Sequence, residues 1–200
     1  MSLAKEIMEI EERIGKVLSE KRFFHTRGVM YTSASLAMSY GANMEHAMLA
    51  GLLHDCAKYL SESEQLRQCS KHHLPVREVE KRNPYLLHAK VGAYFAEKKY
   101  GITDPEILSA ITWHTTGKPA MSVMDKIVFI ADYIEPGRKM IEGLPEIRTM
   151  AFQDLDRTVY KILDNTLHYL KKDKEGKKKE IDCMTQEAYN YYKELLKKKP

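Results

Sequence analysis

The sequence predicts an all-α protein, and three observations lead to that prediction. Apolar residues recur at spacings of three and four along most of the chain, which is the period of an amphipathic helix. Residues that commonly start or stop helices stand at the ends of these segments. No stretch alternates apolar and polar residues convincingly as a strand would, and no internal repeat is found. A length of 200 residues fits one compact domain over residues 1–200.

Six helices are expected in the first half of the chain. Leu3, Ile7 and Ile10 begin an apolar stripe with helical spacing along the first of them. Gly41 can end the second helix and Asn43 can cap the third, which is apolar nearly all round and should therefore be buried. Ser61 and Glu64 match a capping box at the start of the fourth helix, and a short fifth helix follows Pro75. Asn83 and Pro84 begin the sixth helix and Gly101 ends it. The first three segments are residues 3–18, 25–40 and 44–57, and the sixth is residues 85–99.

Four more helices are expected in the second half. Asp104 followed by Pro105 is a cap with proline in the first turn, and Ser122 with Asp125 matches a capping box. The segments are residues 106–114, 122–133, 146–170 and 185–196, with breaks at Gly117, Pro119, Pro136 and Gly137. A lysine-rich linker at about residues 171–179 separates the last two helices.

The composition excludes several classes of protein. The longest apolar runs, such as Met48 to Leu53, are too short to cross a bilayer. The first twelve residues lack the basic start and apolar core of a signal peptide, so we expect a cytoplasmic protein. Three cysteines without a CxxC pair argue against a disulfide framework. The charge of +4 comes largely from lysine runs without interleaved aromatic residues, so nucleic acid is not the expected partner.

Imidazole and carboxylate side chains occur on helices that should be buried. His25 begins one helix, His54 and Asp55 end a core helix, and Asp132 lies near the end of another apolar helix. Burying such groups is costly unless they are paired or bind a metal. These donor types suit iron, manganese, zinc or cobalt, and four ligands would leave open positions on a six-coordinate ion. Because such an ion activates water for attack on phosphorus, the set predicts a metal-dependent phosphohydrolase.

The order of these residues matches a known signature. A single His-Asp pair arises easily by chance, but His25, then His54 with Asp55, then Asp132 is the H…HD…D order of the HD superfamily. Beyond this order, the chain resembles the YqeK family of bacterial HD proteins from about Phe23 to Leu170. The segments that carry the resemblance are HTRGV, LAGLLHDCAK, NPYLLHAKVGA, AITWHTTGKPAMSVMDKIVFIADYIEPGR and RTMAFQDLDRTV.

The resemblance implies a fold and an activity. The fold would be an HD-domain helical bundle with its core at about residues 20–170, followed by a C-terminal linker and helix at residues 171–200. The activity would be the symmetrical cleavage of diadenosine tetraphosphate into two ADP with bound iron. The rival interpretations are an HD phosphohydrolase for a deoxynucleotide, cyclic or guanosine nucleotide, and a non-catalytic nucleotide-binding or ribosome-associated module. A homodimer is compatible with the apolar content of the first and last helices.

The resemblance also implies roles for individual residues. The implied metal ligands are His25, His54, Asp55 and Asp132. Asp55 would also orient the attacking water. His88 and His114 would face the substrate phosphates, although some HD enzymes use two such histidines for a second metal; one ion is expected here. The residues interpreted as nucleotide contacts are Arg22, Lys58, His88, His114, Thr115, Arg138 and Lys139.

Overall fold

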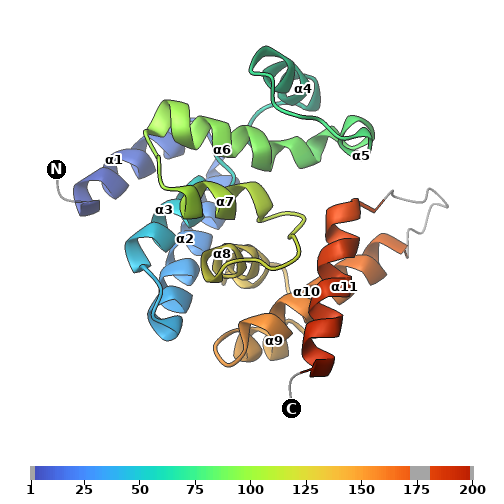
Figure 1. Ribbon diagram of the computed structural model, residues 1–200. Coiled ribbons are helices and arrows are strands. Elements are labelled where there is room, and N and C mark those ends of the chain that lie inside the picture. Colours follow the sequence, from blue (N-terminus) through green and yellow to red (C-terminus); the bar gives the residue numbers. More distant parts are fainter. Residues whose placement is uncertain (1–2, 172–180, 199–200) are drawn as a thin grey trace.

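The computed structural model describes residues 3–171 and 181–198, and over these residues the chain is helical without any strand (Figure 1). The all-α prediction is confirmed. The helices are α1 (Leu3–Gly15), α2 (Glu20–Tyr40), α3 (Met44–Leu53), α4 (Glu62–Lys71), α5 (Glu78–Arg82), the 3₁₀ helix η1 (Pro84–Leu86), α6 (Leu87–Tyr100), α7 (Pro105–Trp113), α8 (Val123–Ile134), α9 (Leu144–Ala151), α10 (Leu155–Lys171) and α11 (Cys183–Lys198).

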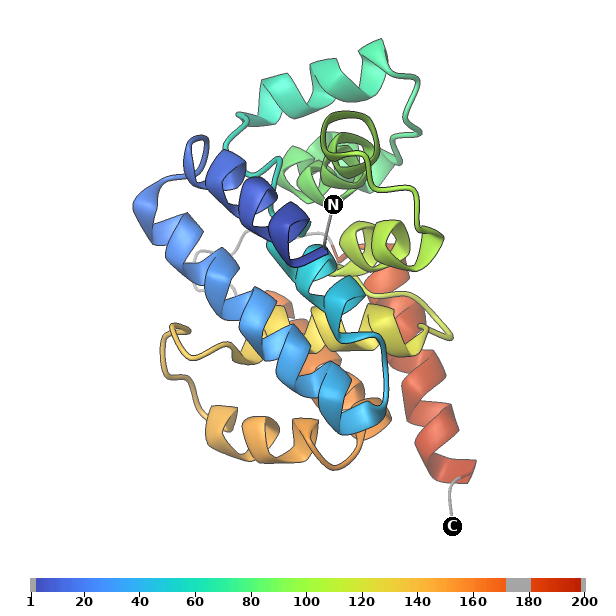
Figure 2. The same cartoon turned by 90° about the vertical axis from the view of Figure 1, so that its left-hand side faces the viewer.

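Helix α8 lies at the centre of the molecule. It packs against α2, α3, α7 and α10, and α2 and α3 lie side by side (Figure 2). Ile127, Val128 and Ile130 on α8 are fully buried. An apolar helix of this kind can contact neighbours on several sides without exposing apolar surface to water. Polar side chains on α8 and on the helices around it are therefore brought together inside the protein.

The local signals at the helix ends are largely confirmed. Ser122 and Asp125 form the predicted capping box at the start of α8. Gly41 and Gly101 end α2 and α6 in the left-handed conformation, with φ of 64° and 75°. Such angles favour glycine, which has no side chain to clash with the backbone. Ser61 caps α4 through its own hydroxyl, which accepts from the Glu64 N–H.

Several predicted boundaries were wrong. α2 begins at Glu20 and not at residue 25, because Ser19 caps it and the hydroxyl accepts from the Arg22 N–H at 3.4 Å. The helix predicted over 44–57 ends at Leu53, and residues 54–57 form turns instead. The helix predicted over 146–170 is two helices, because Asp154 starts a new helix by accepting from the Arg157 N–H at 3.0 Å.

The sequence also led to predictions about the cysteines, membrane spans and the lysine-rich linker. Cys56, Cys69 and Cys183 are all free thiols. None of the helices in the described ranges is long and apolar enough to cross a membrane. Apart from Lys171, the lysine-rich linker predicted at residues 171–179 lies outside the described residues.

Candidate metal centre

Five helices deliver six side chains to one place beside α8. His25 comes from α2, and His54 and Asp55 follow directly after α3. The other three are His88 on α6, His114 at the end of α7 and Asp132 on α8. His54, Asp55, His88 and His114 are each at most 3% exposed.

The four predicted ligands lie close together. His25 Nε2 is 3.0 Å from Asp132 Oδ1, and His54 Nε2 is 3.4 Å from Asp55 Oδ2 and 3.8 Å from Asp132 Oδ1. Neither of these two Nε2 atoms makes a hydrogen bond with any described residue, although both are buried. Buried polar atoms without a partner are rare in folded proteins. Two unpartnered imidazole nitrogens beside two carboxylates are a donor set that fits a divalent metal ion.

Helix geometry turns the Nε2 atoms of three histidines toward the centre. The Nδ1 atoms of His54 and His114 lie 2.6 and 2.7 Å from the carbonyl oxygens of Gly51 and Ile111, three residues earlier in each case. His88 Nδ1 contacts the Tyr85 carbonyl in the same way. A carbonyl accepts only, so Nδ1 carries the proton and Nε2 keeps a lone pair. This is the tautomer that a metal ligand needs.

Asp55 lies between two groups of histidines. Its Oδ2 atom faces His54, whereas its Oδ1 atom lies 3.3 Å from His88 Nε2 and 3.7 Å from His114 Nε2. The His88 and His114 Nε2 atoms are 3.2 Å apart. Asp55, His88 and His114 therefore form a further set of donor atoms close enough to hold an ion. His114 also belongs to a set with His54 and Asp132, so the sets of donor atoms adjoin one another at this histidine.

The electrostatic environment favours the ionised carboxylates. Burial alone would raise the pKa of Asp55, but His54, His114 and His88 overcome that effect and hold its pKa well below its usual range. For Asp132, the same effect of burial on the pKa is overcome chiefly by His25 and Arg138. Burial lowers the pKa of His88 to about 4, although Asp55 acts in the opposite direction. At neutral pH the centre thus contains two carboxylates and an uncharged His88, as metal coordination requires.

Positively charged side chains surround the centre. Arg22 Nη1 lies 2.8 Å from Asp55 Oδ2, and Arg138 Nη2 lies 2.5 Å from Asp132 Oδ1. Both line a hollow of about 580 Å³ beside His25, together with Lys139. We call it the basic hollow; its lining is Ser19, Lys21, Arg22, Phe24, His25, Glu135, Gly137, Arg138 and Lys139.

Lys58 and Thr115, two of the remaining four residues interpreted as nucleotide contacts, lie beside the other two, His88 and His114. Lys58 Nζ is 3.0 Å from His88 Nδ1, and the Thr115 hydroxyl is 3.2 Å from His88 Nε2 and 3.0 Å from His114 Nε2. Burial lowers the pKa of Lys58, although Asp55 raises it. The seven residues interpreted as nucleotide contacts thus divide into two groups, one on each side of Asp55.

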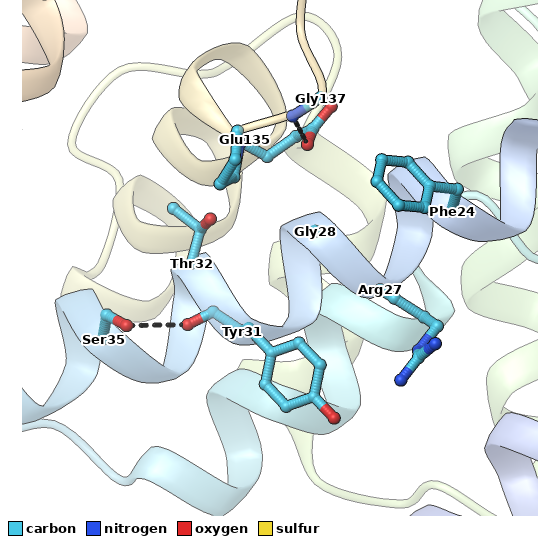
Figure 3. Close-up of a pocket in the computed structure, with 9 residues that line it drawn as sticks. Phe24, Arg27, Gly28, Tyr31, Thr32, Ser35, Glu135 and Gly137 are labelled. Carbon is cyan, nitrogen blue, oxygen red and sulfur yellow. Dashed lines mark hydrogen bonds between the residues drawn. The ribbon is translucent and has the colours of Figure 1, made fainter.

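Glu135 is a contributor that the sequence analysis missed. Its buried carboxylate accepts the N–H of Gly137 on Oε2 (Figure 3). Its Oε1 atom lies 3.0 Å from His25 Nδ1. A carboxylate behind a metal-binding histidine fixes the ring and its tautomer. Its position in the sequence could have identified it, because Glu135 follows Asp132 by three residues, directly after α8.

Glycine makes room for this carboxylate. A Cβ atom on Gly28 would lie 2.4 Å from Glu135 Oε2, and one on Gly137 would lie 3.0 Å from the same atom. Figure 3 shows Gly28 on α2 and the neighbouring Glu135, and both line an apolar pocket of about 340 Å³ together with Phe24 and Tyr31. This pocket lies behind Glu135, on the Nδ1 side of His25.

Comparison with known proteins agrees with these observations. Residues 22–137 match the family model of the HD domain. The chain is 38% identical to a protein of Bacillus subtilis named bis(5′-nucleosyl)-tetraphosphatase, symmetrical, over 78% of this chain and 82% of that protein. Its identity to a Staphylococcus aureus protein of the same name is 40%, over 95% of this chain and 98% of the other.

A solved structure supports the same relationship. It is a crystal structure from Clostridium acetobutylicum described as a "predicted HD superfamily hydrolase involved in NAD metabolism". The two chains are 40% identical and superpose with a TM-score of 0.87, over 94% of this chain and 96% of the other.

Replacing Gly28 with alanine should destabilise the protein. The new methyl group would meet the Glu135 carboxylate, so we expect the free energy of unfolding to fall by about 1–3 kcal/mol. Urea denaturation followed by circular dichroism measures this. Gly92→Ala is the matched control, because its Cβ would make only ordinary contacts at 3.5 Å or more. Equal stabilities of the two variants would contradict the tight fit around Glu135.

Replacing Glu135 with glutamine should weaken metal binding without unfolding the protein. The negative charge behind His25 is removed while the shape is kept, and we expect a loss of about 10- to 100-fold in affinity for Mn²⁺ or Co²⁺. Calorimetric titration of metal-free protein measures the affinity. Glu146→Gln, an exposed carboxylate on α9, is the control. An unchanged affinity in Glu135→Gln would show that Glu135 does not support the ligand.

Proposed function

The chain belongs to the HD-domain family of hydrolases, and from this premise we propose that it cleaves diadenosine tetraphosphate symmetrically into two ADP. Relatives at 38–42% identity carry the name of that activity. The observation that carries the proposal is the pair of buried, unpartnered Nε2 atoms on His25 and His54 beside two ionised carboxylates. A bound metal ion would occupy the space where these nitrogens face the two carboxylates without hydrogen bonds to them.

We propose iron as the resident metal, held by His25, His54, Asp55 and Asp132. Imidazole and carboxylate donors suit ferrous iron, and manganese, cobalt or zinc would also fit this donor set. When bound, such an ion lowers the pKa of a coordinated water and polarises the phosphorus that the water attacks. Asp55 would orient that water, because its carboxylate lies within 4.0 Å of the Nε2 atoms of all four histidines of the centre.

The surrounding residues would bind and neutralise the tetraphosphate. Arg22 and Arg138 lie at the carboxylates of Asp55 and Asp132, where each guanidinium can also grip phosphate oxygens through its forked N–H groups. Lys58 adds positive charge on the His88 side. His88, His114 and Thr115 would contact the phosphate that leaves with ADP. Lys139 would contact the phosphates in the basic hollow.

The number of ions is a further part of the proposal. The sequence led us to expect one ion. Because the two oxygens of Asp55 face different histidines, we propose that Asp55, His88 and His114 can hold a second ion. His114 is also close to the donor atoms of His54 and Asp132, so the two proposed ions would be neighbours.

Two rival functions remain distinct from this proposal. Another nucleotide would use the same centre, and only the products can separate that case from symmetrical cleavage of diadenosine tetraphosphate. A non-catalytic nucleotide-binding or ribosome-associated module would not need the complete set of ligands, which this chain keeps. We propose a cytoplasmic location, which suits a protein with three free cysteines. The homodimer stays a prediction.

The proposed reaction should yield one product. Protein purified without oxygen and supplied with ferrous iron is incubated with diadenosine tetraphosphate, and the nucleotides are separated by chromatography. We expect ADP alone, and we expect His54→Ala and Asp55→Ala to lose both metal and activity while keeping their helical circular dichroism spectrum. Formation of ATP with AMP, or no turnover by the iron-loaded protein, would refute the proposed substrate and cleavage.

Replacing His114 with alanine should show whether the centre holds one ion or two. His114 belongs to the second group of donors, so we expect the variant to keep one equivalent of metal, lose the other and turn over at least about 100-fold more slowly. Elemental analysis of the anaerobically loaded protein gives the stoichiometry. Wild-type protein that binds one equivalent, with no change in His114→Ala, would exclude the second ion.

A further inference from the structure

Helix α2 carries a stripe of large apolar side chains that face solvent. Phe24, Tyr31 and Met38 are 67%, 52% and 63% exposed, and they recur every seven residues. Residues seven apart lie on the same side of a helix, because seven residues are close to two turns. Other residues of α2 pack on α3 and α8, and α2 runs along the front of the molecule in Figure 2. The stripe therefore lies outside the core of the chain.

Small residues separate the large ones. Gly28 lies between Phe24 and Tyr31, and Ser35 lies between Tyr31 and Met38. The first four of these residues line the apolar pocket of about 340 Å³ beside Glu135 (Figure 3). A cavity of about 150 Å³ is enough to bind benzene, so the pocket has room for an aromatic side chain. Large and small residues thus alternate at spacings of four and three, the pattern of helices that pack against each other.

We propose that two copies of the chain associate through α2, with the two helices antiparallel about a twofold axis between Gly28 and Tyr31. This arrangement places Tyr31 of one copy opposite Gly28 of the second copy, and Phe24 opposite Ser35. Tyr31 of the second copy would enter the pocket beside Glu135. The inference goes beyond the proposed function and does not depend on it. It also assigns the expected homodimer to a surface other than the first and last helices.

The order of sizes along the stripe favours a second copy as the occupant. From Phe24 to Ser35 the stripe runs large, small, large, small. In the opposite direction it runs small, large, small, large, so every large residue meets a small one on an antiparallel copy. A twofold interface uses the same patch on both subunits and therefore requires a patch that is complementary to itself. The stripe meets this requirement.

The exposed apolar surface is large enough for a stable dimer. Met140 and Ile141 are 62% and 46% exposed, and they lie in the loop that begins at Gly137, next to Phe24. A large side chain with half of its area exposed presents on the order of 100 Å², so these two and the three of the stripe present about 500 Å² per copy. A standard interface covers about 800 Å² per partner, of which about 60% is non-polar. The stripe and the loop therefore supply the apolar share of such an interface.

The charges in the pocket do not oppose the contact. Arg27 is paired with Glu11 of its own chain at 2.8 Å. Glu135 accepts the N–H of Gly137 and contacts His25. These are the two charged residues that line the pocket, so a second copy would not leave either charge there buried and unpaired.

Sedimentation velocity of the full chain measures the association directly. We expect the wild type to sediment as a dimer. Tyr31→Glu places a charge in the contact and Ser35→Trp fills the space opposite Phe24, so each should raise the dissociation constant of the dimer at least about 30-fold, the scale of a lost hot-spot residue. Tyr191→Glu, the same change at a 38% exposed tyrosine on α11, is the control and should stay dimeric.

Circular dichroism verifies that each variant is folded. A monomeric wild type would overturn the proposal, and so would a dimer that persists unchanged in both Tyr31→Glu and Ser35→Trp.

A disulfide tests the antiparallel register. Phe24→Cys and Ser35→Cys are combined in a chain that also carries Cys183→Ser, because Cys183 is exposed, and the protein is oxidised with diamide. Eleven residues of helix span about 16 Å, which is too far for a disulfide within one chain. We therefore expect covalent dimers on a denaturing gel.

The two single cysteine variants are the controls for the register. Equivalent positions of the two copies would lie about 16 Å apart along the antiparallel helices, so neither Phe24→Cys nor Ser35→Cys alone should form covalent dimers. Cross-linking of the single variants, or none in the double variant, would refute the proposed arrangement.

Discussion

The buried carboxylate of Asp55 is the constraint on which the rest of the centre depends. An ionised carboxylate is expensive to bury, and only close positive or polar partners offset that cost. Asp55 meets this condition with Arg22 on one oxygen and three histidines around it. These partners come from α2, α6, α7 and the turn after α3, so the requirements of one side chain fix the relative positions of four segments.

The surroundings of Asp55 are asymmetric. On the His25 side the centre opens to arginines and lysines, and on the His88 side it adjoins a mainly apolar space in which the charges are paired. His25 is held from behind by Glu135, whereas His54 and His114 are held by backbone carbonyls of α3 and α7, and His88 by the Tyr85 carbonyl of η1. A carbonyl needs no additional residue, and the helix supplies it wherever histidine stands near its end. Glu135 needs two glycines to make space for it.

The sequence predicted the fold class and the set of residues at the centre, but not how they are arranged. Helical periodicity and end signals such as Ser122 with Asp125 are local, so they could be recognised without tertiary information. The break at Asp154 was missed because the apolar spacing continues across it. Glu135 was missed because its role depends on contact with His25, 110 residues away. The two-sided position of Asp55 likewise depends on how α6 and α7 pack, which no spacing in the sequence encodes.

Met184, in the first turn of α11, lines an apolar hollow of about 450 Å³ together with Trp113 and Thr115, and this has a consequence for the order in which the site is synthesised. Every residue of the centre lies between His25 and Asp132, whereas the hollow is closed by the beginning of α11. Because a chain emerges from the ribosome from its N-terminus, the proposed metal ligands are all synthesised before the last wall of the hollow. A nascent chain would therefore possess all of the proposed ligands while the neighbouring hollow is still open. The ion pair of Arg77 with Asp182, 2.8 Å apart, then joins the start of α5 to the residue just before the final helix.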